Sequence, residues 1–446
     1  MRAIAPVIGG IDWSWSLDGP IVLVAMLCAV SAAIPGNFLV LRRMSLLGDA
    51  ISHAVLPGIA AAFFITGSRA SLPLFIGAVV VGSLTAFFTG WVARVGRVDE
   101  GASMGVVFTS LFAIGLIMIV QIADTVDLDV SCVLYGSIET VALDQTTWFG
   151  LTLPRAAWSI AIVCVVNLAF VTLFFKELQL ASFDAGLATS SGFSAAVLHY
   201  ALMILVAITA VASFESVGSV LVVAMFIVPP ATAFLLTQRL SRMILISIAL
   251  AVVSAVAGYV LAVAGPRAFG FESTKVAGCI SVVAGGMFAA AVLFSPQTGV
   301  VPRRIRSRRL RREILRDDIL AYLFRVEERS ESRGSAATDF SSLRQILLCK
   351  ASRLKRCLSE LQRDGRIAMD ALHYRLTDAG RTEAVKLVRS HRLWETYLQD
   401  HADVDPQRLH VHAEQMEHFT DPQLRQRLDR LTDTATDPHG SPIPKE

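Results

Sequence analysis

Long apolar stretches separated by short polar connections fill the first two-thirds of the chain. A helix needs roughly 20 apolar residues to cross the hydrocarbon core of a bilayer. Nine stretches approach or reach this length, and each predicts a transmembrane helix. The predicted spans are residues 21–41, 50–66, 72–95, 103–122, 158–175, 195–212, 217–236, 243–264 and 276–294. The pattern therefore predicts an all-α polytopic membrane domain.

The pattern changes to amphipathic after residue 316. Apolar residues recur at helical spacing in 317–328, 341–362 and 378–400, whereas 367–377 alternates as a two-stranded wing does. Asp364 and Gly365 end the second of these helical stretches. The order helix, helix–turn–helix, hairpin, helix predicts a winged-helix α+β domain followed by a helical region.

Charge is divided between the same two parts of the chain. Residues 1–295 contain only 12 of the 40 lysine and arginine residues and 14 of the 37 acidic residues. Basic residues follow the first, third, fifth, seventh and ninth spans, and the connection after the fourth span is acidic. Since basic loops favour the cytoplasmic side, we expect the N-terminus outside and the C-terminus inside. The connection with Arg267 and Lys275 is the exception.

An arginine-rich stretch, residues 303–316, follows the last predicted span. It contains eight arginines and one glutamate. Such a flank is typical of contact with anionic lipid headgroups. A contact with nucleic acid is the alternative.

Asp49 and His53 are the first candidates for chemistry. They are four residues apart, so they share one face of a helix, at the start of an apolar run. Placing an ionisable side chain inside a bilayer costs free energy, so such residues usually have a function. A carboxylate and an imidazole together can bind a transition metal. The alternative is an interfacial aspartate beside a hydrogen-bonded histidine.

Residues 38–60, FLVLRRMSLLGDAISHAVLPGIA, resemble the signature of bacterial ABC-type zinc, manganese and iron importer permeases. Residues 176–192 and 216–237 resemble two further segments of that family. The resemblance implies that Asp49 and His53 lie on the transport pathway. It also implies that Asp184, Ala188 and Gly192 belong to a loop that docks the ATPase.

The resemblance implies partners as well. The chain contains no GxxxxGK[ST] loop, so we expect no ATP hydrolysis by this chain and a separate ABC ATPase subunit. The family also implies an extracytoplasmic metal-binding protein and a second permease subunit, identical or related. The expected location is the bacterial inner membrane.

Histidine and glutamate gather near the C-terminus. His410, Glu414 and His418 recur every four residues beside Glu417. His391 and Glu395 form another pair on the preceding predicted helix. Donors of this kind without a thiol suit Mn²⁺ or Fe²⁺ better than a structural zinc site. A solvated charged helix is the alternative.

The segments SHRLWETYLQD, LHVHAEQMEHFTDPQLRQRLDRL and DPHGSPIP resemble the metal-binding and dimerisation region of iron- and manganese-dependent winged-helix repressors. The resemblance implies two metal sites. Their residues would be His391, Glu414, Glu417 and His418 in one, Glu395 and His410 in the other, and Asp317 from the first helix.

Two positions bear on that resemblance. Leu320 stands where the family's first helix offers another ligand. Glu414 stands where the iron-sensing branch has a cysteine, which favours Mn²⁺ over Fe²⁺ or Zn²⁺.

The predicted recognition helix of the winged-helix domain, residues 350–362, is basic in its first half. Lys350, Arg353, Lys355 and Arg356 are candidates for DNA contact. An ordinary exposed helix face is the alternative.

These observations predict a permease fused to a metal sensor. The expected domains are a permease at 1–296, a basic linker at 297–316, a winged-helix domain at 317–380 and a metal-binding and dimerisation region at 381–446. Two alternatives remain open. One is a membrane-tethered, metal-dependent transcriptional regulator, and the other is a secondary metal transporter with a cytoplasmic sensor.

Overall fold

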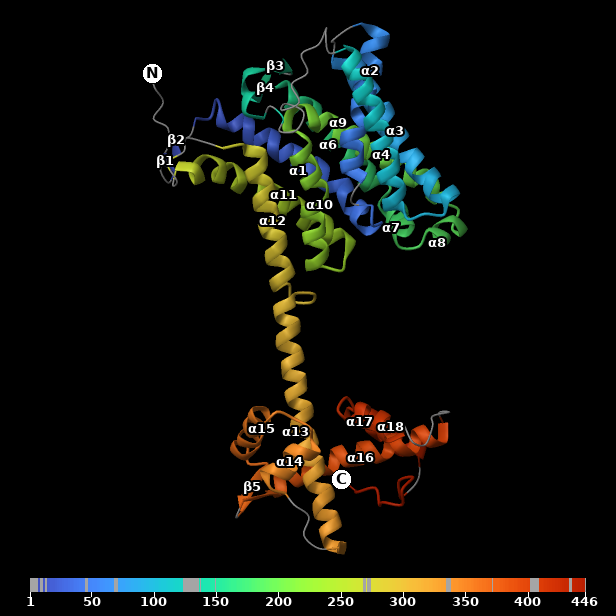
Figure 1. Cartoon of the computed structure of the whole chain (residues 1–446), viewed down its shortest axis with the longest axis vertical. Coiled ribbons are helices and arrows are strands. Elements are labelled where there is room, and N and C mark those ends of the chain that lie inside the picture. Colours follow the sequence, from blue (N-terminus) through green and yellow to red (C-terminus); the bar gives the residue numbers. More distant parts are fainter. Residues whose placement is uncertain are drawn as a thin grey trace. The chain divides into compact units, whose positions relative to one another are not determined.

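The computed structural model comprises two compact units, Met1–Pro302 and Arg303–Glu446 (Figure 1). The structure describes the whole chain except for a set of short segments. These are residues 1–6, 9–10, 13, 45–46, 68–70, 123–135, 137, 149, 268–269, 271–273, 334–337, 371, 402–408, 433–434 and 446.

The first unit is a bundle of apolar helices. In the described part of the chain, nine helices are long and apolar enough to cross a membrane. They are α1 (Asp18–Leu41), α2 (Leu47–Thr66), α3 (Ser71–Gly96), α4 (Glu100–Ile122), α6 (Arg155–Leu173), α9 (Ala195–Val217), α10 (Ser219–Leu236), α11 (Leu240–Arg267) and α12 (Val276–Phe294). They correspond to the nine predicted spans, which confirms the polytopic fold class.

Several short elements of the first unit were not predicted, because each lacks a long periodic pattern. The acidic connection after the fourth span falls mostly outside the described residues. The short elements are β1 (Val7–Ile8), β2 (Ile11–Asp12), the 3-10 helix η1 (Ile138–Leu143), β3 (Gln145–Trp148), β4 (Leu151–Pro154), α7 (Phe175–Phe183) and α8 (Ala185–Ser190).

Helix α1 forms the centre of the first unit. It packs against α6, α9, α10 and α11, and most of its residues are buried. Two buried side-chain amides form hydrogen bonds between α1 and its neighbours. The side-chain amide of Asn37 donates to Oγ of Ser247 at 2.8 Å, and that of Asn167 donates to the carbonyl of Ser31 at 2.9 Å. Such bonds between helices stabilise membrane bundles by roughly 0.6 kcal/mol each.

Helices α2, α3 and α4 pack against one another beside this centre. Gly58 of α2 and Gly77 of α3 face each other so closely that a Cβ on either would clash with the carbonyl oxygen of the other. Small residues allow such backbone approach between membrane helices. This packing fixes α2, the helix that carries Asp49 and His53.

The second unit has the predicted winged-helix order. Helices α17 and α18 both pack on α16 (Figure 1). Its elements are α13 (Val300–Arg333), α14 (Phe340–Ile346), α15 (Ala351–Arg363), β5 (Ile367–Asp370), β6 (His373–Leu376), α16 (Asp378–His401), α17 (Leu409–Glu417) and α18 (Pro422–Thr432).

Most of the stretch expected as a basic linker forms the first half of α13. Arginine is a good helix former, and Arg309 pairs with Glu313 one turn later. Helix formation therefore continues without a break from this stretch into the first helix of the winged-helix fold.

The winged-helix core joins α13 to α15 and the wing. Ile319 and Leu323 of α13 are buried with Leu354 and Leu358 of α15. Burying each such side chain contributes about 1.5–3 kcal/mol. The strands β5 and β6 pair antiparallel, with Ile367 opposite Leu376.

Candidate functional site

The Asp49–His53 pair lies in the first two turns of α2. Nε2 of His53 is 3.4 Å from Oδ1 of Asp49, and both side chains are partly exposed. The pair borders a groove of about 270 Å³, whose other walls are Phe108, Thr109 and Phe112 of α4. One oxygen and one nitrogen donor thus face a narrow, largely apolar groove between two membrane helices.

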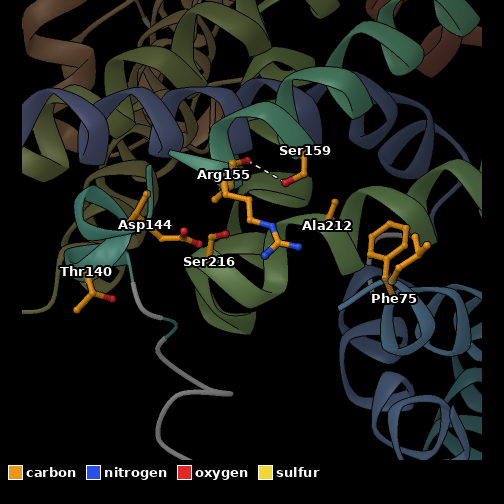
Figure 2. A pocket seen from close by; sticks show the side chains of 10 residues that line it. Phe75, Thr140, Asp144, Arg155, Ser159, Ala212 and Ser216 are labelled. Carbon is orange, nitrogen blue, oxygen red and sulfur yellow. Dashed lines mark hydrogen bonds between the residues drawn. The ribbon is translucent and has the colours of Figure 1, made fainter. Parts of the chain in front are cut away.

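A larger pocket, of about 370 Å³, was missed by the sequence analysis. It lies where η1, α3, α6 and α9 meet. Figure 2 shows the side chain of Arg155 extending between Asp144 and Ser216 on one side and Ala212 on the other. The backbone N–H of Arg155 donates to the carbonyl of Asp144 at 3.0 Å, which closes the β3–β4 hairpin. The available signal was a pair of ionisable residues, Asp144 and Arg155, flanking a ten-residue segment directly before a span.

Asp184, Ala188 and Gly192 are brought together by the short helix α8. Oδ1 of Asp184 caps the helix by accepting from the backbone N–H of Leu187 at 2.8 Å. Ala188 is fully buried. Gly192 has φ +90° and follows the helix, and the N–H of Phe193 donates back to the carbonyl of Ala188. This geometry is a Schellman stop, so the spacing of the three residues is that of a helix with a cap at each end.

Two groups of possible metal donors occur in the second unit among the described residues. The first joins His391 and Glu395 of α16 to His410 of α17. Nε2 of His391 is 3.1 Å from Oε1 of Glu395 and 3.0 Å from Nδ1 of His410. Nδ1 of His410 is 2.9 Å from the same glutamate oxygen. Three donor atoms at such spacing can share one small cation, whose bonds to nitrogen and oxygen are about 2.0–2.2 Å long.

The second group joins α13 to the end of α17. Nε2 of His418 lies 3.4 Å from Oδ1 of Asp318 and 3.8 Å from Oε1 of Glu417. Nδ1 of His418 lies 3.2 Å from Oδ2 of Asp317. Asp318 was not among the predicted donors, and its neighbour Asp317 was. The sequence offered no way to see that both adjacent aspartates face a histidine about 100 positions further along the chain.

The structure groups these side chains differently from the resemblance. His391 lies with Glu395 and His410, and it touches the second group only through Glu417. Glu414 is exposed on α17 and belongs to neither group. Leu320 is buried in the winged-helix core, so α13 offers its carboxylates from Asp317 and Asp318 instead.

The contact between His391 and Glu417 joins the two groups, and its atoms show whether the site suits a metal ion. Nδ1 of His391 and Oε2 of Glu417 are 2.6 Å apart and buried. Within the described part of the chain, neither atom has a hydrogen bond of good geometry. Buried polar atoms without such bonds are costly, and a divalent ion coordinated by the carboxylate of Glu417 would give that carboxylate a cationic partner. The residues present therefore fit a divalent ion.

The electrostatics of the two groups also favour positive charge. Burial opposes ionisation of Glu395, but hydrogen bonds with His391 and His410 outweigh it and lower the pKa of Glu395 below its usual range. Burial also opposes the charged form of His418, yet hydrogen bonds to Asp317 and Asp318 raise its pKa to about 10. Carboxylates that stabilise an imidazolium in this way also stabilise a bound cation.

The candidate DNA-contact residues lie together on α15. Lys350 is the N-cap residue, and Arg353, Lys355 and Arg356 lie in the first two turns. All four side chains are exposed, while Leu354 and Leu358 of the same helix face the core. The helix therefore presents a basic face at its N-terminal half.

Two protein families match the chain. The ABC 3 transport family matches residues 19–295. The iron dependent repressor, metal binding and dimerisation domain matches residues 377–445.

Relatives and solved structures agree with these matches. Manganese transport system membrane protein MntD of Bacillus subtilis (strain 168) is 42% identical over 299 residues, covering 67% of this chain and 99% of that protein. Zinc transport system membrane protein TroD of Treponema pallidum (strain Nichols) is 40% identical over 294 residues, covering 66% and 78%. The solved structure of PsaBC from Streptococcus pneumoniae in complex with Fab has a TM-score of 0.51 and 31% identity, covering 63% of this chain and 92% of that one.

Proposed function

The chain belongs to the ABC 3 transport family, and on that premise we propose that it forms the membrane pathway of an importer for a divalent transition metal. Its tail carries the metal-binding and dimerisation domain of iron-dependent repressors, and we propose that this domain senses the imported ion. The observation that carries the proposal is the presence, on one chain, of the permease match and of two clusters of metal donors. Membership of an ABC family sets aside the secondary transporter.

Transport requires partners in this proposal. An ABC ATPase subunit supplies the energy and contacts the short helix α8, whose cap residues are Asp184 and Gly192. An extracytoplasmic metal-binding protein delivers the ion, and a second permease subunit completes the pathway. The proposed domain boundaries remain 1–296 for the permease, 317–380 for the winged-helix domain and 381–446 for the metal-binding region.

The distribution of basic loops supports an inner-membrane orientation with the C-terminal unit in the cytoplasm. In this orientation the pocket that contains Arg155 faces outward, because it lies at the start of α6 and the end of α9. Asp49 and His53, at the start of α2, lie toward the cytoplasm. We place them at the last stage of the pathway, where a carboxylate and an imidazole release the ion.

Mn²⁺ is the first candidate for the ion bound by the tail, with Fe²⁺ and Zn²⁺ as alternatives, because all donors are nitrogen or oxygen. His391, Glu395 and His410 would hold one ion, and Asp318, Glu417 and His418 another. A bound divalent ion would neutralise the negative charge of the carboxylates in each group. The side chains themselves come from α13, α16 and α17, so occupancy would hold those three helices together.

The transport proposal is tested by uptake of radiolabelled Mn²⁺ in cells that lack their own importer and express the partner subunits. We expect Asp49→Ala and His53→Ala to lower uptake by about 10–100-fold, the usual effect of losing a metal-site group. Asp99→Ala is the control, because Asp99 is an exposed carboxylate between α3 and α4. Normal uptake by both variants at normal expression would remove the pair from the pathway.

Metal-dependent DNA binding by the same chain is the second candidate function. The observation that favours it is the exposed basic face of α15. A gel-shift assay with the full chain in lipid nanodiscs, with and without Mn²⁺, tests it. We expect Lys350→Ala to reduce the salt dependence of binding by about one phosphate contact. Lys386→Ala, an exposed lysine on α16, should leave it unchanged. If Mn²⁺ induces no binding, the tail is a sensor and not a repressor.

A further inference from the structure

A basic groove lies between α13 and α15, within the second unit. Its volume is about 620 Å³. Residues of the metal-donor groups do not line it. The groove is lined by six arginines, which are Arg304, Arg308, Arg311 and Arg312 of α13 and Arg353 and Arg356 of α15.

The spacing of these arginines along each helix places them on the face that lines the groove. Arg304, Arg308 and Arg311 are at positions i, i+4 and i+7 of α13, and so share one face of that helix. Arg353 and Arg356 are at i and i+3 of α15. Buried Leu315 and Cys357 join the two helices along the same lining. The packing of the winged-helix core therefore holds the two arginine rows opposite each other.

The groove has little negative charge of its own. Arg312 pairs with Glu360 at 3.3 Å. For the other five arginines, the described part of the chain provides no ion pair. Guanidinium groups concentrated in this way repel one another. An anion with several oxygens would relieve that repulsion, and the guanidinium fork matches the geometry of phosphate.

We propose that this groove binds the phosphate headgroup of an anionic phospholipid, such as phosphatidylglycerol, from the cytoplasmic leaflet of the proposed orientation. The inference goes beyond the proposed transport and sensing. Arg304 is only ten residues beyond Phe294, the last residue of the membrane helix α12. Clusters of basic residues directly after a membrane span and basic pockets between helices both recognise anionic lipid.

The shape of the groove favours lipid over nucleic acid. Its volume lies within the range of about 300–1,000 Å³ typical of sites for small molecules. A headgroup can enter a space of that size between two helices. A DNA duplex is read instead by a protruding helix or ribbon that enters its major groove, about 12 Å wide. Duplex binding is therefore an outcome of the test and not the proposal.

The proposed site shares Arg353 and Arg356 with the candidate DNA-contact face of α15. A headgroup in the groove would engage these two guanidinium groups. Lipid and DNA would then compete for the same side chains, so the membrane would act as a competitor of nucleic acid.

The test uses the full chain in nanodiscs that contain a photoactivatable phosphatidylglycerol. We expect cross-links in peptides from 303–316 and 351–363, suppressed by unlabelled phosphatidylglycerol but not by phosphatidylcholine. The triple variant Arg304→Gln, Arg308→Gln, Arg311→Gln should lower the cross-link yield by about tenfold, since each basic contact near the membrane surface contributes appreciably to lipid binding.

The matched control is Arg303→Gln, Arg306→Gln, Arg309→Gln. It removes the same charge from the same helix, outside the groove lining. Because changes next to a span can also alter membrane insertion, Arg353→Gln with Arg356→Gln on α15 provides a second groove variant, and we expect the same loss.

Equal losses in the groove and control variants would overturn the proposal in favour of diffuse attraction to the membrane. Unchanged cross-linking in the α15 variant would overturn it as well. Protection of the groove arginines by a DNA duplex, with no effect of phosphatidylglycerol, would identify a nucleic-acid surface instead. None of these outcomes depends on transport, which is measured separately by uptake.

Discussion

At the scale of single residues, the adjacent Asp317 and Asp318 contact different nitrogens of His418. Oδ1 of Asp318 faces Nε2 of His418, the nitrogen that also faces Glu417. Asp317 faces the other nitrogen, Nδ1. An imidazole gives only one nitrogen to a given ion, and the other is usually held by a carboxylate that orients the ring. Asp318 is therefore the expected ligand, and Asp317 the residue that positions His418.

This assignment predicts unequal effects on metal affinity. We expect Asp317→Asn to weaken binding of Mn²⁺ by about tenfold, as losses of orienting groups do. Asp318→Asn should weaken it more, because a ligand is removed. Calorimetric titration of the full chain in detergent measures both variants. A larger loss for Asp317→Asn than for Asp318→Asn would reverse the two roles.

Two glutamates on one helix give a second prediction. Glu417 is buried and contacts both His391 and His418, whereas Glu414 is exposed and outside both donor groups. We expect Glu417→Gln to lower Mn²⁺ affinity by at least about tenfold and Glu414→Gln to leave it unchanged. The same titration compares them. A strong effect of Glu414→Gln would show that α17 turns inward on binding metal.

At the scale of elements, the C-terminal end of helix α8 is held by the Schellman motif at Gly192. Gly192 has φ +90°, a conformation that costs other residues about 1–3 kcal/mol. Gly192→Ala should therefore loosen the end of α8 and lower ATP-driven uptake. Thr189→Ala is the control within the same helix, because Thr189 is exposed, its hydroxyl donates to the carbonyl of Ala185 one turn earlier, and alanine is the better helix former.

Both α8 variants are compared by Mn²⁺ uptake at matched expression. We expect normal uptake for Thr189→Ala and reduced uptake for Gly192→Ala. Equal uptake by the two would mean that the stop at Gly192 does not contribute to coupling with the ATPase.

Elements with a long pattern were predictable, and those defined by distant contacts were not. The bilayer requires long apolar runs, so all nine spans could be predicted. The wing alternates with period two, and β5 and β6 fall where expected. The pocket at Arg155 depends on the β3–β4 hairpin and on α9, which no local pattern joins. Asp318 likewise meets His418 only through the packing of α13 near α17.

At the scale of the whole molecule, the chain consists of two units with separate cores. Both proposed metal-donor groups lie in the second unit. A ligand stabilises only the unit that binds it, by about 2.7 kcal/mol at one hundred times its dissociation constant. Thermal unfolding of the full chain should thus show two transitions, of which Mn²⁺ raises only one.

The variant Glu395→Gln identifies that transition, because Glu395 belongs to the first donor group. We expect the variant to reduce the shift and a chelator to abolish it in the unchanged chain. Differential scanning calorimetry measures both. If Mn²⁺ raised the two transitions equally in Glu395→Gln, the tail would not be the source of the stabilisation.

One helix connects two of the proposed binding sites. Helix α13 carries Arg304 of the basic groove and, about 20 Å further along its axis at 1.5 Å per residue, Asp317 and Asp318. Two ligands held by one rigid helix can influence each other, and thermodynamic linkage makes any such influence reciprocal. Whatever factor a bound lipid applies to the affinity for Mn²⁺, Mn²⁺ must apply to the affinity for lipid. The lipid composition of the membrane would then set the intracellular metal concentration at which the sensor responds.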